Sequence, residues 1–173
     1  MDSIKLKVKC FVGFIFVAIG LVFLPSISQA EAFNKGSTVA TLGIGSGQLF
    51  RESYLIFGAG VGYYVADGLE VGLEVDYWSG GNPTVYELTP RLTYIYDNGA
   101  QIKPYLGVFI NRTYIEDRPD SDAYGYRAGV LMKAGRSVYV GFGLVNTELQ
   151  DCNDTPFFSC SETYTEASII FSL

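Results

Sequence analysis

Between Gly36 and Leu173, apolar and polar residues alternate in eight short runs, and turn-forming residues separate the runs. The run from Leu69 to Tyr77 is the clearest. Leucine, valine and tyrosine occupy one set of alternate positions, and glutamate, glycine and aspartate occupy the other. Successive side chains of a strand point to opposite faces, so this run predicts a strand with one apolar and one acidic face. The whole pattern predicts an all-β domain.

The connections between the runs differ in length. The alternation places strands at about residues 37–45, 53–65, 69–78, 84–96, 102–111, 124–133, 137–145 and 162–173. Asp67 and Gly68 form an expected tight hairpin, because Asp-Gly tolerates the positive φ that such turns require. The turns after the second, fourth and sixth strands are short, whereas residues 112–123 and 146–161 form longer polar loops. With both chain ends on one side, the short turns share that side and the long loops share the other.

The first 30 residues have the pattern of a signal peptide. Three lysines precede an apolar stretch at residues 11–24, and Ser28-Gln29-Ala30 provides small residues for cleavage. The apolar stretch is shorter than the about 20 residues that a spanning helix needs. We therefore expect a signal peptide at 1–30 and one barrel domain at 31–173; an uncleaved N-terminal anchor is the alternative.

Charge and cysteine content narrow the function classes. Removing residues 1–30 takes away Asp2 and three lysines and leaves 9 basic and 17 acidic residues. An acidic surface argues against nucleic acid as a partner. Cys152 and Cys160 are expected to form a disulfide in an oxidising compartment. A zinc site is the alternative, but the chain has no histidine to complete the ligands. We expect no cofactor and no metal.

Several segments resemble the small eight-stranded outer-membrane β-barrels of the OmpA/OmpX type, a porin-like family of Gram-negative bacteria. The resemblance covers residues 31–173 and rests on the strand number, the loop asymmetry, the glycine-aromatic segments 58–64 and 103–107, and the last strand. That strand has apolar residues at alternate positions up to the end. The family usually ends in phenylalanine, whereas here Phe171 precedes a terminal Leu173.

The resemblance implies an eight-stranded antiparallel up-and-down transmembrane barrel in the cell outer membrane, present as a monomer. It also implies contacts with outer-membrane lipid and lipopolysaccharide, and recognition of the C-terminal strand by the barrel-assembly machinery. Tyrosine favours the membrane–water boundary. We expect aromatic belts at the two rims: Tyr63, Tyr94 and Phe171, and Tyr77, Tyr86 and Tyr126. A soluble lipocalin-like barrel with the two faces reversed is the alternative.

The faces that the pattern turns inward carry many charged residues. An eight-stranded barrel is only wide enough for side chains to fill it, so unpaired charges there would be costly. We expect Glu74 and Arg91 to pair across neighbouring strands. The interior is interpreted as a closed polar plug, with a gated ion path as the alternative. The expected lumen charge network is Glu70, Glu74, Asp76, Glu87, Arg91, Lys103, Arg127, Lys133 and Glu166.

The long loops are the remaining candidates for a specific role. We expect them to provide a structural or surface-interaction function, including contact with a host or surface ligand; a narrow channel for ions or small solutes is the alternative. The family includes lipid-modifying enzymes that depend on a histidine, and this chain has none, so we expect no enzymatic activity. The candidate loop residues are Glu116, Asp117, Asp120, Asp122, Phe157 and Phe158.

Overall fold

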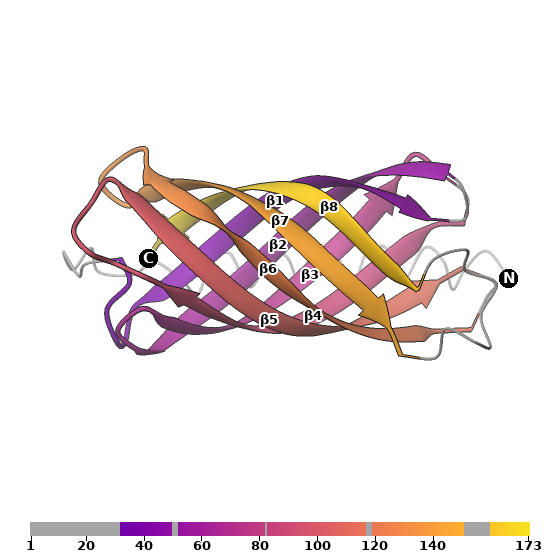
Figure 1. Cartoon of the computed structure of the whole chain (residues 1–173), viewed down its shortest axis with the longest axis horizontal. Helices are drawn as coiled ribbons and strands as arrows, with labels where there is room; N and C mark the ends of the chain where they lie inside the picture. Colours follow the sequence, from indigo (N-terminus) through magenta and orange to yellow (C-terminus); the bar gives the residue numbers. More distant parts are fainter. Residues whose placement is uncertain (1–31, 50–51, 82, 117–118, 151–159) are drawn as a thin grey trace, which may run out of the picture.

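The computed structural model describes residues 32–49, 52–81, 83–116, 119–150 and 160–173. Within them, eight antiparallel strands follow one another around a closed barrel, and β1 pairs with β8 to close it (Figure 1). The all-β, up-and-down prediction is therefore confirmed. The strands are β1 (Thr38–Leu49), β2 (Glu52–Ala66), β3 (Leu69–Ser79), β4 (Val85–Ile95), β5 (Ile102–Ile115), β6 (Ser121–Lys133), β7 (Val138–Leu149) and β8 (Ser161–Ser172).

The two faces of each strand have the chemistry that the alternation predicts. In β5, buried and exposed residues alternate from Ile102 to Ile115 without interruption. Lys103 and Asn111 are buried inside, whereas Leu106 lies on the outside with 59% of its surface exposed. Isoleucine, leucine, valine and tyrosine side chains cover the outside of every strand pair. The barrel therefore has an apolar exterior and a polar interior.

Short turns join the strands at the end where the described chain begins and ends. The turn between β2 and β3 consists of Asp67 and Gly68, and Gly68 has a φ of 75°. A side chain at Gly68 would also collide with the carbonyl oxygen of Ile95. Both features require glycine at this position, as the sequence predicts. We call this end of the barrel the terminal end and the opposite end the mouth.

The expected loop at residues 112–123 is wrong in its bounds. β5 continues to Ile115 and β6 begins at Ser121, so only residues 116–120 connect them. The inside-outside alternation continues through this stretch, and Arg112 lies opposite Asp122 in the ladder. Arg112 and Asp122, two of the charged residues that suggested a loop, therefore belong to strands. The remaining long connection at the mouth is residues 150–160, between β7 and β8.

Among the described residues, no helix has the length and apolar character needed to span a bilayer.

Apolar clusters occupy both ends of the interior. A terminal cluster contains Ala32, Phe33, Val39, Tyr64, Ile95, Tyr105, Leu131, Tyr139 and Ile170. A mouth cluster contains Tyr54, Ile56, Trp78, Val85 and Ile115, with Tyr164 packed against it. Along their strands, Glu74, Arg91 and Arg127 lie between these two clusters.

Candidate functional site

Arg91 is the centre of the charged interior. It comes from β4 and is 7% exposed. Its guanidinium donates hydrogen bonds to Glu70 at 3.0 and 3.3 Å, to Glu74 at 2.6 Å and to the Thr41 hydroxyl at 3.1 Å. The planar guanidinium has five N–H donors in a fixed fork, which suits it to bridging several acceptors. One arginine thus connects β4 to β3 and, across the interior, to β1.

A second arginine extends this network to the opposite wall. Arg127 from β6 lies 3.1 Å from the Glu74 carboxylate on β3 and 3.4 Å from that of Glu166 on β8. The Tyr105 hydroxyl on β5 donates a 2.8 Å hydrogen bond to the same Glu166. β3 and β6 are three strands apart in the barrel, so these bonds cross the lumen. Buried charges are tolerable here because each is paired and hydrogen-bonded.

Glycines make room for these large side chains. A Cβ at Gly62 would lie 2.5 Å from the Glu70 side-chain carboxyl carbon and closer still to its oxygen. A Cβ at Gly72 would lie 2.8 Å from both Arg91 Nε and a Glu70 oxygen. Glycine in a strand often marks such a close approach. Gly62 of β2 and Gly72 of β3 therefore make room for the packing of the charged side chains.

Phe33 closes the terminal end. Its ring lies 4.6 Å from the Tyr139 ring and 5.8 Å from the Tyr64 ring, measured between centroids. Its carbonyl oxygen accepts a 2.8 Å hydrogen bond from the Gly68 amide, which fixes the segment before β1 against the first short turn. Sequence analysis missed this contact, because a residue outside any periodic run gives no signal of its position.

The nine predicted lumen residues divide into groups. Glu70, Glu74, Arg91, Arg127 and Glu166 form the connected network just described. Asp76 and Glu87 face each other in the β3–β4 ladder nearer the mouth, and Glu87 accepts a 3.0 Å hydrogen bond from the Thr113 hydroxyl. Lys103 instead forms an ion pair with Asp97 in the β4–β5 connection.

The remaining residue, Lys133, is exposed at the end of β6, so its expected place inside the network is wrong. The alternation of β6 does turn Lys133 toward the interior. However, Lys133 is the last residue of that strand, and the barrel wall no longer covers it there. At the same end, hydrogen bonds from Lys103 and from the Gly99 amide outweigh the effect of partial burial and hold the pKa of Asp97 below its usual value.

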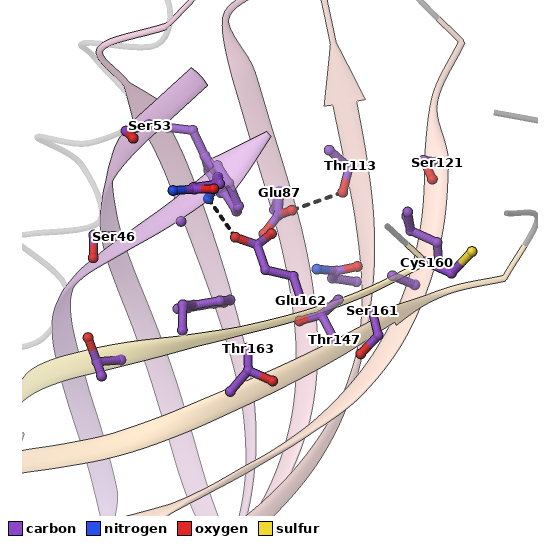
Figure 2. A pocket seen from close by; sticks show the side chains of 18 of the residues that line it. Ser46, Ser53, Glu87, Thr113, Ser121, Thr147, Cys160, Ser161, Glu162 and Thr163 are labelled. Atoms are coloured by element: carbon purple, nitrogen blue, oxygen red, sulfur yellow. Dashed lines mark hydrogen bonds between the residues drawn. The ribbon is translucent and has the colours of Figure 1, made fainter. Parts of the chain in front are cut away.

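The mouth contains a cavity of about 720 Å³ (Figure 2). Hydroxyl, amide and carboxylate side chains line it, together with Trp78 and Tyr164. Figure 2 shows Glu87 and Glu162 among the labelled side chains at its centre. Among the described residues, no group of three or more carboxylates or cysteines is arranged to hold a metal ion.

The candidate loop residues lie partly in the described region. Glu116, Asp120 and Asp122 are exposed at the mouth. Arg112 pairs with Asp120 at 3.1 Å and with Asp122 at 3.5 Å, so part of this acidic cluster is neutralised. Cys160 lies directly before β8. The other loop residues, Asp117, Cys152, Phe157 and Phe158, lie outside the described residues, and the disulfide stays a prediction.

Comparison with solved structures identifies the fold. No protein-family model and no curated protein matches the sequence. The N-terminal β-barrel domain of Pseudomonas aeruginosa OprF superposes with a TM-score of 0.63 at 13% identity, over 80% of this chain and 98% of that domain. Neisserial surface protein A superposes with a TM-score of 0.59 at 15% identity, over 78% of this chain and 95% of that protein. This chain has the fold of the eight-stranded outer-membrane β-barrels.

The barrel fold by itself does not assign an activity. The outer membrane enzyme PagL also superposes, with a TM-score of 0.50 at 13% identity, over 77% of this chain and 98% of that enzyme. Proteins with different roles thus share this architecture, and function has to be argued from the side chains of this chain.

Proposed function

We propose that this protein is an integral outer-membrane barrel with a closed interior, and that it acts at the cell surface in a structural or surface-interaction role. The observation that carries the proposal is the set of bonds across the lumen. Arg91 connects β4 with β1, and Arg127 connects β6 with β3 and β8. The Phe33 contacts close the terminal end as well.

The exterior supports a lipid environment. Its exposed apolar side chains form bands on all strands, and in water a continuous surface of this kind would be an aggregation hazard. Tyrosines flank the bands: Tyr63 and Tyr94 lie near the terminal end, and Tyr77 and Tyr86 lie near the mouth with their rings 5.2 Å apart. Aromatic residues at both rims are typical of transmembrane barrels. These features favour contact with outer-membrane lipid and lipopolysaccharide.

The last strand supports assembly in the outer membrane. In β8, Ile169 and Phe171 are exposed on the outside and Ile170 is buried. This alternation next to the chain end suits recognition by the barrel-assembly machinery. We infer a monomer, because the closed barrel leaves no unpaired strand edge for another copy to extend.

The interior supports a role without enzymatic activity. Catalysis through a Ser-His-Asp or Cys-His arrangement requires a histidine, and the chain has none. The carboxylates of Glu70, Glu74 and Glu166 are held in ion pairs with arginines and are hydrogen-bonded. Groups fixed in this way serve packing and charge balance in the lumen.

The proposal is tested by conductance in a planar lipid bilayer. The purified barrel is inserted after its folded state has been verified by the heat-dependent shift of its gel mobility. We expect no discrete conductance steps, because ion pairs and apolar clusters fill the narrow lumen. Reproducible steps that change in Glu74→Gln or Arg91→Gln variants would refute the closed lumen and establish the narrow channel.

The orientation needs its own experiment. An epitope inserted in the β3–β4 connection is compared with one inserted in the β4–β5 connection, which lies at the terminal end. Intact cells should bind antibody only when the epitope is in the β3–β4 connection, and permeabilised cells should bind it at either position. The reverse result would contradict a surface role for the mouth.

A further inference from the structure

The mouth of the barrel contains a cavity between its side chains. Its volume of about 720 Å³ lies within the range of about 300–1,000 Å³ for small-molecule sites. Residues from all eight strands line it, so the barrel wall itself forms the site. A pocket of this size, with polar groups converging on it, is the default place to seek a ligand.

Serine and threonine hydroxyls, which can donate or accept hydrogen bonds, make up much of the polar lining of this cavity, and two carboxylates and an amide oxygen add acceptors. Glu87 is 8% exposed and accepts a hydrogen bond from Thr113, and Glu162 accepts one from the Gln48 amide (Figure 2). Asn111 is 6% exposed, and its side-chain oxygen has no hydrogen-bond partner. An unsatisfied buried acceptor is costly, so such an atom calls for an explanation. A ligand that donates hydrogen bonds into the cavity would supply the missing partner.

The charge of the cavity points in the same direction. Deeper in the barrel, Glu70, Glu74 and Glu166 each lie within 3.4 Å of an arginine nitrogen. Among the described residues, the lining of the cavity includes no lysine or arginine, and neither Glu87 nor Glu162 has a basic partner. Both carboxylates line the cavity, Glu87 from β4 and Glu162 from β8. Their negative charges would be balanced by a cation from outside.

Aromatic rings indicate which kind of cation fits. Trp78 and Tyr164 line the cavity, and their rings meet edge to face with centroids 6.4 Å apart. Aromatic faces attract organic ammonium groups and also provide apolar contact for a hydrocarbon chain. A bare metal ion would leave most of this volume unfilled and has no carbon chain to pack against the rings.

We propose that the mouth cavity is a binding site for a small organic amine in its cationic form. Its ammonium group lies between Glu87 and Glu162 and donates to the Asn111 side-chain oxygen, while its carbon chain packs against Trp78 and Tyr164. The site goes beyond the proposed surface role, because it assigns a ligand class to the mouth. Binding at this site does not depend on whether the lumen is open or closed. The binding experiment therefore tests the amine site, and the conductance experiment independently tests the closed lumen.

The chain offers a reporter at the site, because Trp78 is its only tryptophan. The folded barrel in detergent at low salt is titrated with putrescine, and tryptophan fluorescence is recorded. We expect a saturable change with putrescine and none with 1,4-butanediol, which has the same chain length but no charge. Added salt should weaken binding, because it screens the interaction between the ammonium group and the carboxylates.

Variants test the named acceptors. Glu87→Gln and Glu162→Gln should each weaken putrescine binding about tenfold or more, since the glutamine oxygen still accepts a hydrogen bond but the negative charge is lost. Glu116→Gln is the matched control, because Glu116 is an exposed carboxylate at the mouth that does not line the cavity. This variant should bind putrescine as tightly as the wild type. Asn111→Leu should weaken binding while leaving resistance to urea equal or higher, because the orphan acceptor disappears.

Several results would overturn the assignment. Folded protein that shows no response to putrescine, or an equal response to butanediol, would exclude an amine site. Saturation by Ca²⁺ without any response to putrescine would make the cavity a metal site. If Glu116→Gln weakened binding as much as Glu87→Gln, the interaction would reflect the general negative charge of the mouth. If Asn111→Leu lowered resistance to urea and left binding intact, Asn111 would serve folding alone.

Discussion

Replacing Arg91 by methionine should expose the energetic role of the interior network. Arg91 forms ion pairs with two carboxylates, but Glu74 keeps a second partner in Arg127 at 3.1 Å. The substitution therefore leaves the Glu70 carboxylate without its ion-pair partner. Glu70 keeps the hydrogen bond from the Tyr64 hydroxyl at 3.5 Å. Removing one partner of a buried pair costs about 3–5 kcal/mol. We expect Arg91→Met to lower the free energy of unfolding by that amount.

A second substitution tests whether the stranded charge is the cause. In the Arg91→Met background, Glu70→Gln removes the unpaired charge, so most of the lost stability should return. Glu70→Gln alone should cost about 1–2 kcal/mol, because Arg91 still pairs with Glu74. The double-mutant cycle should then give a coupling energy of about 2 kcal/mol or more between Arg91 and Glu70.

The assay is equilibrium unfolding in urea, with the barrel in lipid vesicles. Trp78 fluorescence and the heat-dependent gel shift provide two independent probes of the folded state. Arg112→Met is the matched control: Arg112 also pairs with two carboxylates but is 51% exposed, and exposed pairs contribute little. If Arg91→Met cost less than about 1 kcal/mol, or if Glu70→Gln failed to restore stability, the network would not be a set of desolvated pairs.

Three further outcomes are expected. Gly62→Ala should destabilise the barrel by about 1–3 kcal/mol in urea because its Cβ would displace Glu70; Gly43→Ala, whose Cβ would have no neighbour within 3.7 Å, should be tolerated. Tyr105→Phe should cost about 1 kcal/mol, from loss of the hydrogen bond to Glu166, and retained stability would show that this bond is dispensable. Wild type and Asp97→Asn should differ in stability near neutral pH, and the difference should disappear as the pH falls well below 4. The reason is that bonds from Lys103 and Gly99 lower the pKa of Asp97 in the folded state. A difference that persisted in acid would contradict this assignment.

The fold could be predicted from the sequence because strand periodicity fixes which face a residue occupies. The alternation assigns Lys103 and Asn111 to the inside of β5, and the structure buries both. The same rule assigns Lys133 to the inside of β6, yet this residue is exposed. Parity gives the face of a residue but not its height along the barrel, and at a strand end the wall no longer covers it.

The partners inside the lumen could be predicted only in part. Glu74 and Arg91 lie on neighbouring strands, so local register sufficed to bring them together, and they are 2.6 Å apart. The contact of Arg127 with Glu74 depends on the tilt and stagger of all eight strands, which no single run encodes. Phe33 and the unpartnered oxygen of Asn111 likewise depend on what lies across the lumen. Chemistry that spans the barrel is therefore visible only in three dimensions.

The network contributes more to the specification of the fold than to its net stability. A buried ion pair roughly balances its own desolvation, so the bonds of Arg91 and Arg127 add little compared with a well-packed apolar interior. A one-residue slip in the pairing of β3, however, would turn Glu70 and Glu74 toward the exterior and bring Val71 and Leu73 inside. That slip would strand both arginines inside the barrel and place both carboxylates on the apolar face. The buried charges thus make the wrong register highly unfavourable. This effect on register explains why so narrow an interior retains charged side chains.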